Sequence, residues 1–238
     1  MIELALGRVH AVWTDRHGGG SRPPYDEANL SLRGGDDPDA VRANRRVLAD
    51  ALGIAPPEHW WWLDQVHGTT AVTASGAPPA EPVVADAAVT VEPGVPLVVL
   101  TADCAPIALA CDDAAGVVHA GWHGVVAGVI EKAVSTLRSI GNGDVRAALG
   151  PCIHPARYEF GQDDLERVIE RLGPRVEGRT NAGKPALDLP AAVGLALERA
   201  GVADVTDMSQ CTSASRDFFS HRRDGETGRQ GLVVVLDR

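Results

Sequence analysis

The sequence predicts one mixed α/β domain over residues 1–238, built of β-strands covered by helices. Short β-branched, apolar runs separated by Pro and Gly fill its middle, and segments with helical spacing follow them. No linker, repeat or low-complexity tract divides the chain. Hydrophobic residues make up 45% and charged residues 23%, a balance typical of a folded soluble protein and not of a disordered one.

The N-terminal part predicts a strand, a long loop and a helix. Residues 9–14 form the strand, and residues 15–35 form a loop rich in Gly, Arg and Pro. Because such a loop is unusually long for a compact domain, it is a candidate binding loop. Asp37-Pro38 predicts a helix start and Gly53 its end. This helix carries three arginines that either face solvent or bind an anion, namely Arg42, Arg45 and Arg46.

The rest of the chain predicts a series of strands followed by alternating helices and strands. The central strands are expected at residues 71–73, 85–91, 96–101, 107–110 and 117–120. Apolar residues then recur at i, i+3 and i+4 from Val126 to Ile140, which predicts one amphipathic helix ending near Gly141. The remaining expected elements are a strand at 145–149, helices at 163–172 and 189–200, and a buried closing strand at 232–236.

Charge and apolar patterning argue against several classes of protein. Lys and Arg number 22 against 32 Asp and Glu, and this net charge of −10 disfavours binding to nucleic acid or to an anionic membrane. No apolar run is long enough to predict a membrane span, and no secretory signal pattern is visible, so a cytoplasmic location is expected. The four cysteines include no CxxC pair and are expected to be free thiols, metal ligands or nucleophiles.

Three short stretches concentrate side chains that are costly to bury without a purpose. They are Asp64-Gln-Val-His67-Gly, Thr101-Ala-Asp-Cys104-Ala-Pro and His119-Ala-Gly-Trp-His123-Gly. Because each lies at the end of a predicted strand, we expect them to meet at one pocket. A thiolate and two imidazoles suit zinc with one open position, so His67, Cys104 and His119 are candidate ligands. Two alternatives remain open: Cys104 is a nucleophile activated by His119, or these side chains are inert core residues.

Further short motifs run in order along nearly the whole chain. They are Thr14-x-Arg16-x-Gly-Gly, Asn29-Leu-Ser-Leu, Val41-x-x-Asn44-Arg45, Gln65-Val-His-Gly68, Ala85-Asp86-Ala, Thr101-Ala-Asp-Cys-x-Pro106, His119-Ala-Gly-Trp122, Gly150-Pro-Cys-Ile153, Phe218-Phe-Ser-His-Arg222-Arg-Asp-Gly225 and Thr227-Gly-Arg229. Together they resemble the YfiH/YlmD family, whose members carry the names polyphenol oxidase (laccase), purine nucleoside phosphorylase and peptidoglycan editing factor. The resemblance implies a four-layer α/β/β/α sandwich and a metal site, usually zinc, at the positions of His67, Cys104 and His119.

The resemblance also implies an activity. It predicts a zinc-dependent purine nucleoside phosphorylase with adenosine deaminase activity, whose partners are a nucleoside and phosphate. The sequence leaves open whether the protein is a monomer or a small homo-oligomer. Deamination needs a carboxylate to shuttle protons, for which Asp103 is the first candidate and Asp86 the second. Arginine suits phosphate binding, and Arg16, Arg45 and Arg222 lie in matching motifs.

The sequence departs from the family at one position, and two alternative activities remain open. His123 stands where the family usually has Arg, so phosphorolysis is expected to be weakened or to use another cation. The alternatives are a cysteine or metal hydrolase that edits peptidoglycan precursors and a copper-loaded polyphenol oxidase. The eight histidines include no His-x-His pair of the multicopper kind.

The cluster Trp60–Trp62 is expected to pack in the core in preference to stacking on a nucleobase.

Overall fold

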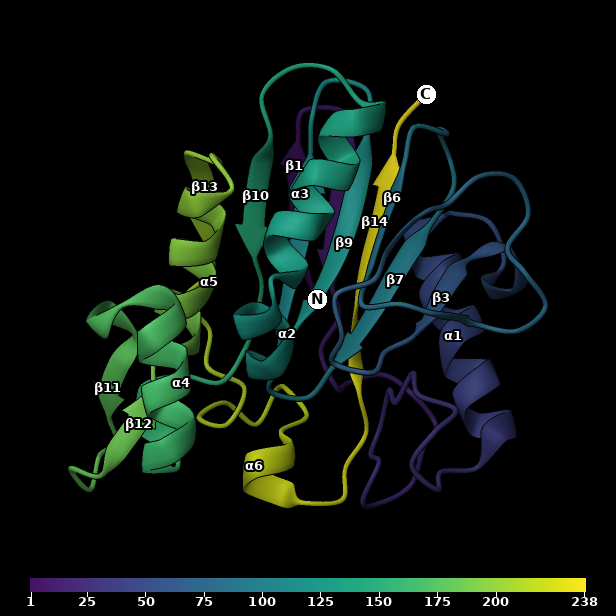
Figure 1. Cartoon of the computed structure of the whole chain (residues 1–238). Coiled ribbons are helices and arrows are strands. Elements are labelled where there is room, and N and C mark those ends of the chain that lie inside the picture. The colour runs from purple at the N-terminus through teal and green to yellow at the C-terminus, as the bar shows by residue number, and fades with distance from the viewer.

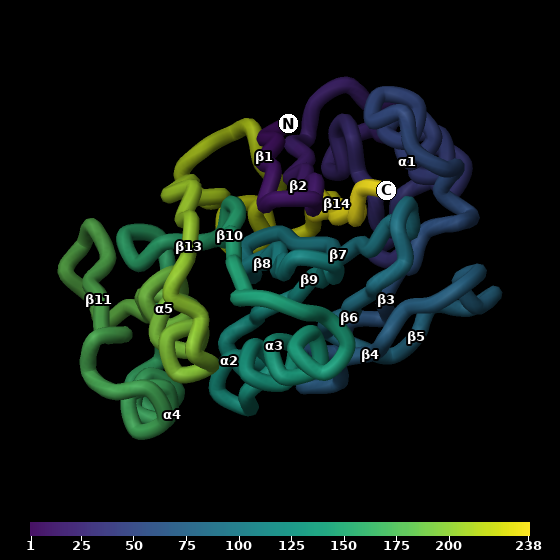
Figure 2. The backbone as a smooth tube through the Cα atoms, turned by 90° about the horizontal axis from the view of Figure 1, so that it is seen from above, coloured from purple at the N-terminus to yellow at the C-terminus, as the bar shows by residue number.

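Two six-stranded sheets pack face to face, and helices cover both outer faces (Figures 1 and 2). The computed structural model describes residues 1–238. The first sheet has the order β1 (Ile2–Leu6), β2 (Val9–Trp13), β14 (Gln230–Leu236), β7 (Leu97–Thr101), β3 (Trp61–Asp64), β5 (Val83–Val84). The second has the order β13 (Asp204–Asp207), β10 (Arg146–Leu149), β8 (Ala105–Ala110), β9 (Ala115–Ala120), β6 (Ala87–Thr90), β4 (Ala71–Thr73). This is the expected α/β/β/α sandwich.

The core between the sheets pairs large side chains with small ones. Strand β14 turns Leu232 and Val234 toward the second sheet, whose strands contribute mainly alanines such as Ala108 and Ala148. Val233 and Val235 alternate to the outer face. Because both faces of the central strands are buried, these strands read as continuous apolar runs.

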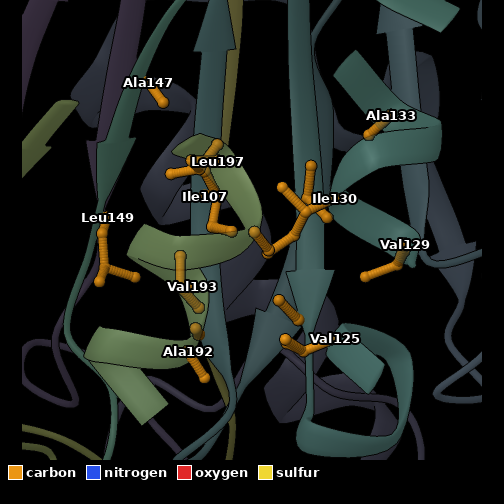
Figure 3. Close-up of a cluster of buried hydrophobic side chains, with 14 of the residues drawn as sticks. Ile107, Val125, Val129, Ile130, Ala133, Ala147, Leu149, Ala192, Val193 and Leu197 are labelled. Carbon is orange, nitrogen blue, oxygen red and sulfur yellow. The ribbon is translucent and has the colours of Figure 1, made fainter. Parts of the chain in front are cut away.

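Helices form the two outer layers. Helix α1 (Pro38–Leu52) lies on the first sheet, and it begins and ends as expected, with Asp37 accepting a hydrogen bond from the Asp39 N–H and Gly53 in a left-handed conformation. The second sheet is covered by α2 (Trp122–Ala127), α3 (Val129–Ile140) and α5 (Leu189–Arg199), and α4 (Gln162–Leu172) packs against α2 and α5. Figure 3 shows Ile107 of β8 packed between Ile130 of α3 and Val193 of α5.

Some expected boundaries are wrong. The helix expected at 126–140 is two helices, α2 and α3, because Gly128 adopts a φ of 99° and ends α2. Strand β6 is shorter than the expected 85–91, and β1 was missed although four of its five residues are apolar. Strand β13 and the short pair β11 (Glu177–Arg179) and β12 (Pro185–Leu187) were missed because they are short and β11 and β13 carry few apolar residues. None of the helices has the length and apolarity that a membrane crossing requires.

Strand register brings the chemically interesting segments to one end of the sandwich. Strands β3 and β7 run parallel, and β8 pairs with β9 so that Ala105 faces Ala120. Strand β14 pairs with β7 so that Gln230, its first residue, faces Thr101, the last residue of β7. The ends of β3, β7 and β9 and the starts of β8 and β14 therefore meet at the lower end of Figure 1, near α2 and the four-residue helix α6 (His221–Asp224).

Candidate metal centre

His67, Cys104 and His119 meet at this end of the sandwich. His67 lies in the loop after β3, Cys104 directly precedes β8, and His119 lies in β9. One ligand atom from each lies within 4.8 Å of those of the other two. Cys104 Sγ is 3.7 Å from His67 Nε2, and the two imidazole rings meet edge to face with their centroids 4.8 Å apart. His67 is exposed and His119 is buried, so the cluster is open on the His67 side.

The spacing of the Cys104 and His67 donors fits a zinc ion. Tetrahedral bond lengths of about 2.3 Å to sulfur and about 2.0 Å to nitrogen place the two donor atoms about 3.5 Å apart. The 3.7 Å between Cys104 Sγ and His67 Nε2 is close to that separation. Three protein donors and an open side also match the arrangement of catalytic zinc sites, which keep one position for water or substrate.

Asp86 holds two of the three donors in place. Its side chain is fully buried, and Oδ1 accepts from His119 Nδ1 at 2.8 Å and from the His67 N–H at 3.0 Å. Oδ2 accepts from the N–H groups of Gly68 at 2.7 Å and Val66 at 3.3 Å. These bonds stabilise the left-handed backbone of His67, whose φ is 58°. They also fix the His119 tautomer with Nδ1 protonated, which leaves Nε2 as its donor to a metal.

The electrostatics of the cluster favour a thiolate. Burial opposes ionisation of Cys104, but the neighbouring His119 and His67 imidazoles lower its pKa to about 6. Burial likewise opposes the charged form of His119, but the Cys104 thiolate and the Asp86 carboxylate raise its pKa to about 9. The thiolate is the form that both binds metals and acts as a nucleophile.

Asp103 positions the turn that carries Cys104. Its backbone has a φ of 104°, its Oδ1 accepts from Thr212 Oγ1 at 2.6 Å, and its Oδ2 accepts from the Arg222 N–H at 2.6 Å. Its carbonyl accepts from the Ile153 N–H at 2.9 Å. Both carboxylates predicted to shuttle protons, Asp103 and Asp86, therefore accept protein hydrogen bonds on both oxygens. These contacts favour a positioning role for each.

Two of the predicted phosphate-binding arginines lie at this end but are engaged by the protein. Arg16 donates to the Asp26 carbonyl at 2.7 Å, pairs with the Asp26 carboxylate at 3.3 Å, and lies over the Phe219 ring. Arg222 donates through Nη1 to the Glu159 carbonyl at 2.6 Å. Arg222 is also linked to the turn that carries Cys104, because its backbone N–H binds Asp103.

Arg45 lies elsewhere. Its Nε donates to the Leu30 carbonyl at 2.8 Å, and its guanidinium stacks 3.5 Å above the Trp62 ring. It lines a cavity of about 880 Å³ that is also lined by residues of α1 and β3 and by none of the three candidate ligands. The structure thus separates Arg45 from the cluster. Trp60 is buried and its ring stacks on that of Trp62 with the centroids 5.5 Å apart, which confirms that the tryptophans of residues 60–62 pack within the protein.

An aromatic wall beside the cluster was not expected from the sequence. It consists of Trp122, His123, Tyr158 and Phe160. The His123 ring stacks on Trp122 at 3.7 Å and lies 6.5 Å from the ring of His67. Phe160 joins Trp122 to Tyr158 through two edge contacts. Trp122 was visible in the third motif, but nothing in the sequence links it to residues 158 and 160, which follow a loop.

Fold and cluster define a four-layer α/β/β/α protein with an open His–Cys–His site at one end of its two sheets. A family model described as multi-copper polyphenol oxidoreductase laccase matches residues 10–237. The structure is similar to YlmD from Geobacillus stearothermophilus (TM-score 0.88, 34% identity, 97% of this chain and 93% of that one) and to YfiH from Bacillus licheniformis (TM-score 0.88, 28% identity, 96% and 93%). The chain belongs to this laccase-like YfiH/YlmD family.

Curated relatives of the chain carry an enzyme name. It is 42% identical over 235 residues to a purine nucleoside phosphorylase of Streptomyces coelicolor, covering 96% of each chain. It is 41% identical over 238 residues to a purine nucleoside phosphorylase of Streptomyces griseus, covering 97% of this chain and 96% of the relative.

Proposed function

We propose that the protein is a zinc-dependent purine nucleoside phosphorylase that also deaminates adenosine. The observation that carries the proposal is the convergence of the His67, Cys104 and His119 donor atoms within 4.8 Å of one another, beside an aromatic wall. Curated relatives at 36–42% identity that match it nearly end to end are named purine nucleoside phosphorylase, which supports a nucleoside and phosphate as substrates. A reducing cytoplasm, the proposed location, would keep its four cysteines as the free thiols observed.

In this proposal each part of the site has a task. His67, Cys104 and His119 hold zinc, which supplies activation of water for deamination and Lewis-acid polarisation of bound substrate. Asp86 keeps His119 oriented, and Asp103 keeps the Cys104 turn in place. The aromatic wall provides faces on which a purine stacks. The Tyr158 hydroxyl, whose pKa burial raises above its ordinary value of 10.0, is protonated at neutral pH and can donate to a purine nitrogen.

The test is product analysis on protein purified without added metal. Zinc content is measured by mass spectrometry, and adenosine is then incubated with the enzyme in the presence and absence of phosphate. Adenine that forms only with phosphate reports phosphorolysis, whereas inosine that forms under both conditions reports deamination. Zinc-loaded enzyme that makes neither product overturns the proposal.

A second candidate is a cysteine hydrolase that acts on peptidoglycan precursors. The observation that favours it is the thiolate–imidazolium pair formed by Cys104 and His119, which has the groups of a metal-free nucleophile and base. It predicts that chelators leave hydrolysis of a muropeptide amide intact and that Cys104→Ser abolishes it.

The third candidate, a copper-loaded polyphenol oxidase, would use the same three ligands. His67, Cys104 and His119 are the single group of three or more His, Cys, Asp or Glu side chains close enough to share an ion. Copper binds tightly to such nitrogen and sulfur donors, so phenol oxidation would follow the copper content of the preparation.

A further inference from the structure

Arg229 is a partly buried arginine that has no carboxylate partner. Its Nη1 donates to the carbonyls of Thr227 at 2.8 Å and Gly228 at 2.9 Å, and Arg229 takes part in none of the ion pairs of the structure. Its backbone is fixed, because its N–H donates to Asn29 Oδ1 at 2.8 Å and its carbonyl accepts from the Leu30 N–H at 3.0 Å. The guanidinium is therefore held in place by its own loop with Nε and Nη2 free of protein acceptors.

Strand register places Arg229 beside the metal cluster. Gln230 faces Thr101 across β14 and β7, so the preceding residue, Arg229, follows the same ladder to the turn that holds Asp103 and Cys104. The electrostatics agree with this placement. Burial lowers the pKa of Arg229, and the opposing influence comes chiefly from the negative charges of Cys104 and Asp103.

An unpartnered hydroxyl group accompanies the guanidinium. The Oγ1 atom of Thr227 has no hydrogen-bond partner although the residue is only 6% exposed, and the carbonyl of the same residue receives Nη1 of Arg229. A buried hydroxyl normally finds a partner, so this one indicates that another polar group binds here.

We propose that Arg229 and the Thr227 hydroxyl form the subsite that binds inorganic phosphate next to the metal cluster. A planar guanidinium with free N–H groups and an adjacent hydroxyl donor match the oxygens of a phosphate dianion. This inference rests on the proposed phosphorolysis and names its phosphate-binding residues.

The subsite serves a simple displacement. One oxygen of the bound hydrogen phosphate forms a bond to C1′ of the ribose while the bond between C1′ and the purine nitrogen breaks. The bonding electron pair leaves with the purine, which takes up the proton carried by the phosphate. The products are ribose 1-phosphate and the free base, so no other co-reactant is needed. Arg229 acts by holding the phosphate and its charge throughout.

The experiment compares Arg229→Gln, Arg229→Lys and Thr227→Val with the control Arg146→Gln. Arg146 is the first residue of β10 and pairs with Ala110, at the end of β8 that lies away from Cys104. We expect Arg229→Gln to raise the KM for phosphate about tenfold or more while phosphate-independent formation of inosine stays within about twofold. Arg229→Lys restores part of the affinity because it restores the charge. Thr227→Val raises the KM for phosphate without lowering thermal stability, because its hydroxyl has no partner within the protein. The control changes neither rate.

Calorimetric titration of inorganic phosphate into zinc-loaded protein separates the two proposals. If the wild type binds phosphate and Arg229→Gln does not, the subsite stands even where no adenine is formed and phosphorolysis fails. If the wild type releases adenine and Arg229→Gln, folded and zinc-loaded, keeps the wild-type KM for phosphate, the subsite is overturned and the function stands. Loss of phosphate binding in Arg146→Gln to the same degree also overturns it.

Discussion

Replacing Asp86 with asparagine isolates the role of one buried carboxylate. Its two oxygens accept four hydrogen bonds, from His119 Nδ1 and from the N–H groups of His67, Gly68 and Val66. An amide offers one oxygen and one NH2 group, so two of the four donors lose their acceptor. Hydrogen bonds to a charged group contribute about 1.5–3 kcal/mol each, and the free energy of unfolding should fall by about 3–6 kcal/mol.

The same substitution should weaken metal binding, because Asp86 orients His119 and the His67 backbone. Loss of such an orienting partner typically lowers metal affinity about 10–100-fold. Urea unfolding of the metal-free protein, followed by tryptophan fluorescence, measures the first effect, and competition with a chromophoric zinc chelator measures the second. Asp50→Asn, on the exposed side of α1, is the matched control. Unchanged unfolding free energy and zinc affinity in Asp86→Asn would refute this account of the site.

The pH dependence of unfolding gives an independent check. Burial raises the pKa of Asp86, but hydrogen bonds from His119, Gly68 and Val66 outweigh it and hold the pKa below its ordinary value of 3.8. A carboxyl with a depressed folded-state pKa adds stability above its unfolded-state pKa and loses it as pH falls through the folded-state value. The stability difference between wild type and Asp86→Asn should therefore be full near pH 6 and shrink at pH below 3.8. A difference that grows on acidification would contradict this sign.

Four further predictions concern the metal cluster, the aromatic wall and helix α5. A Cβ at Gly121 would lie 2.5 Å from His67 Cδ2, and because that exposed ring is free to move, Gly121→Ala should lower zinc affinity about tenfold with little loss of stability. Gly194→Ala in α5, where nothing lies within 4 Å, should instead raise stability by about 0.4–1 kcal/mol and leave zinc binding unchanged, as seen by the same chelator competition. Trp122→Leu should raise the KM for adenosine by about tenfold, since base stacking contributes about 1–3 kcal/mol, and an unchanged KM would remove the aromatic wall from purine binding. Chelation should lower the melting temperature of the zinc-loaded wild type but not of Cys104→Ser, a contrast that scanning calorimetry measures.

Elements with strong local signals were predicted well from the sequence. Helix α1 has both of its end signals in the chain, Asp37-Pro38 and Gly53, and its bounds are those expected. The break at Gly128 was missed because apolar spacing continues through it, so periodicity alone does not reveal a left-handed residue. Strand β13 is exposed along its length and owes its position to pairing with β10, which no local pattern records.

The candidate site was predictable only in part. His67, Cys104 and His119 stood out because polar groups at the ends of apolar strands need a reason to be there. The position of Arg45 depends on the tertiary structure, because a motif match carries no information about which side of the first sheet α1 covers. Arg229 lies in a motif that the sequence shows, but only the structure reveals that its guanidinium has carbonyl partners and no carboxylate partner.

The three candidate ligands come from both sheets and from the connection between them. His67 follows a strand of the first sheet, His119 lies in the second, and Cys104 occupies the connection between β7 and β8, where the chain passes from one to the other. Because β8 and β9 pair within the second sheet, a slip of one sheet over the other would separate His67 from Cys104 and His119 before the strands themselves came apart. The visible absorbance of cobalt bound in place of zinc would then report, during denaturation, when the two sheets lose their relative position.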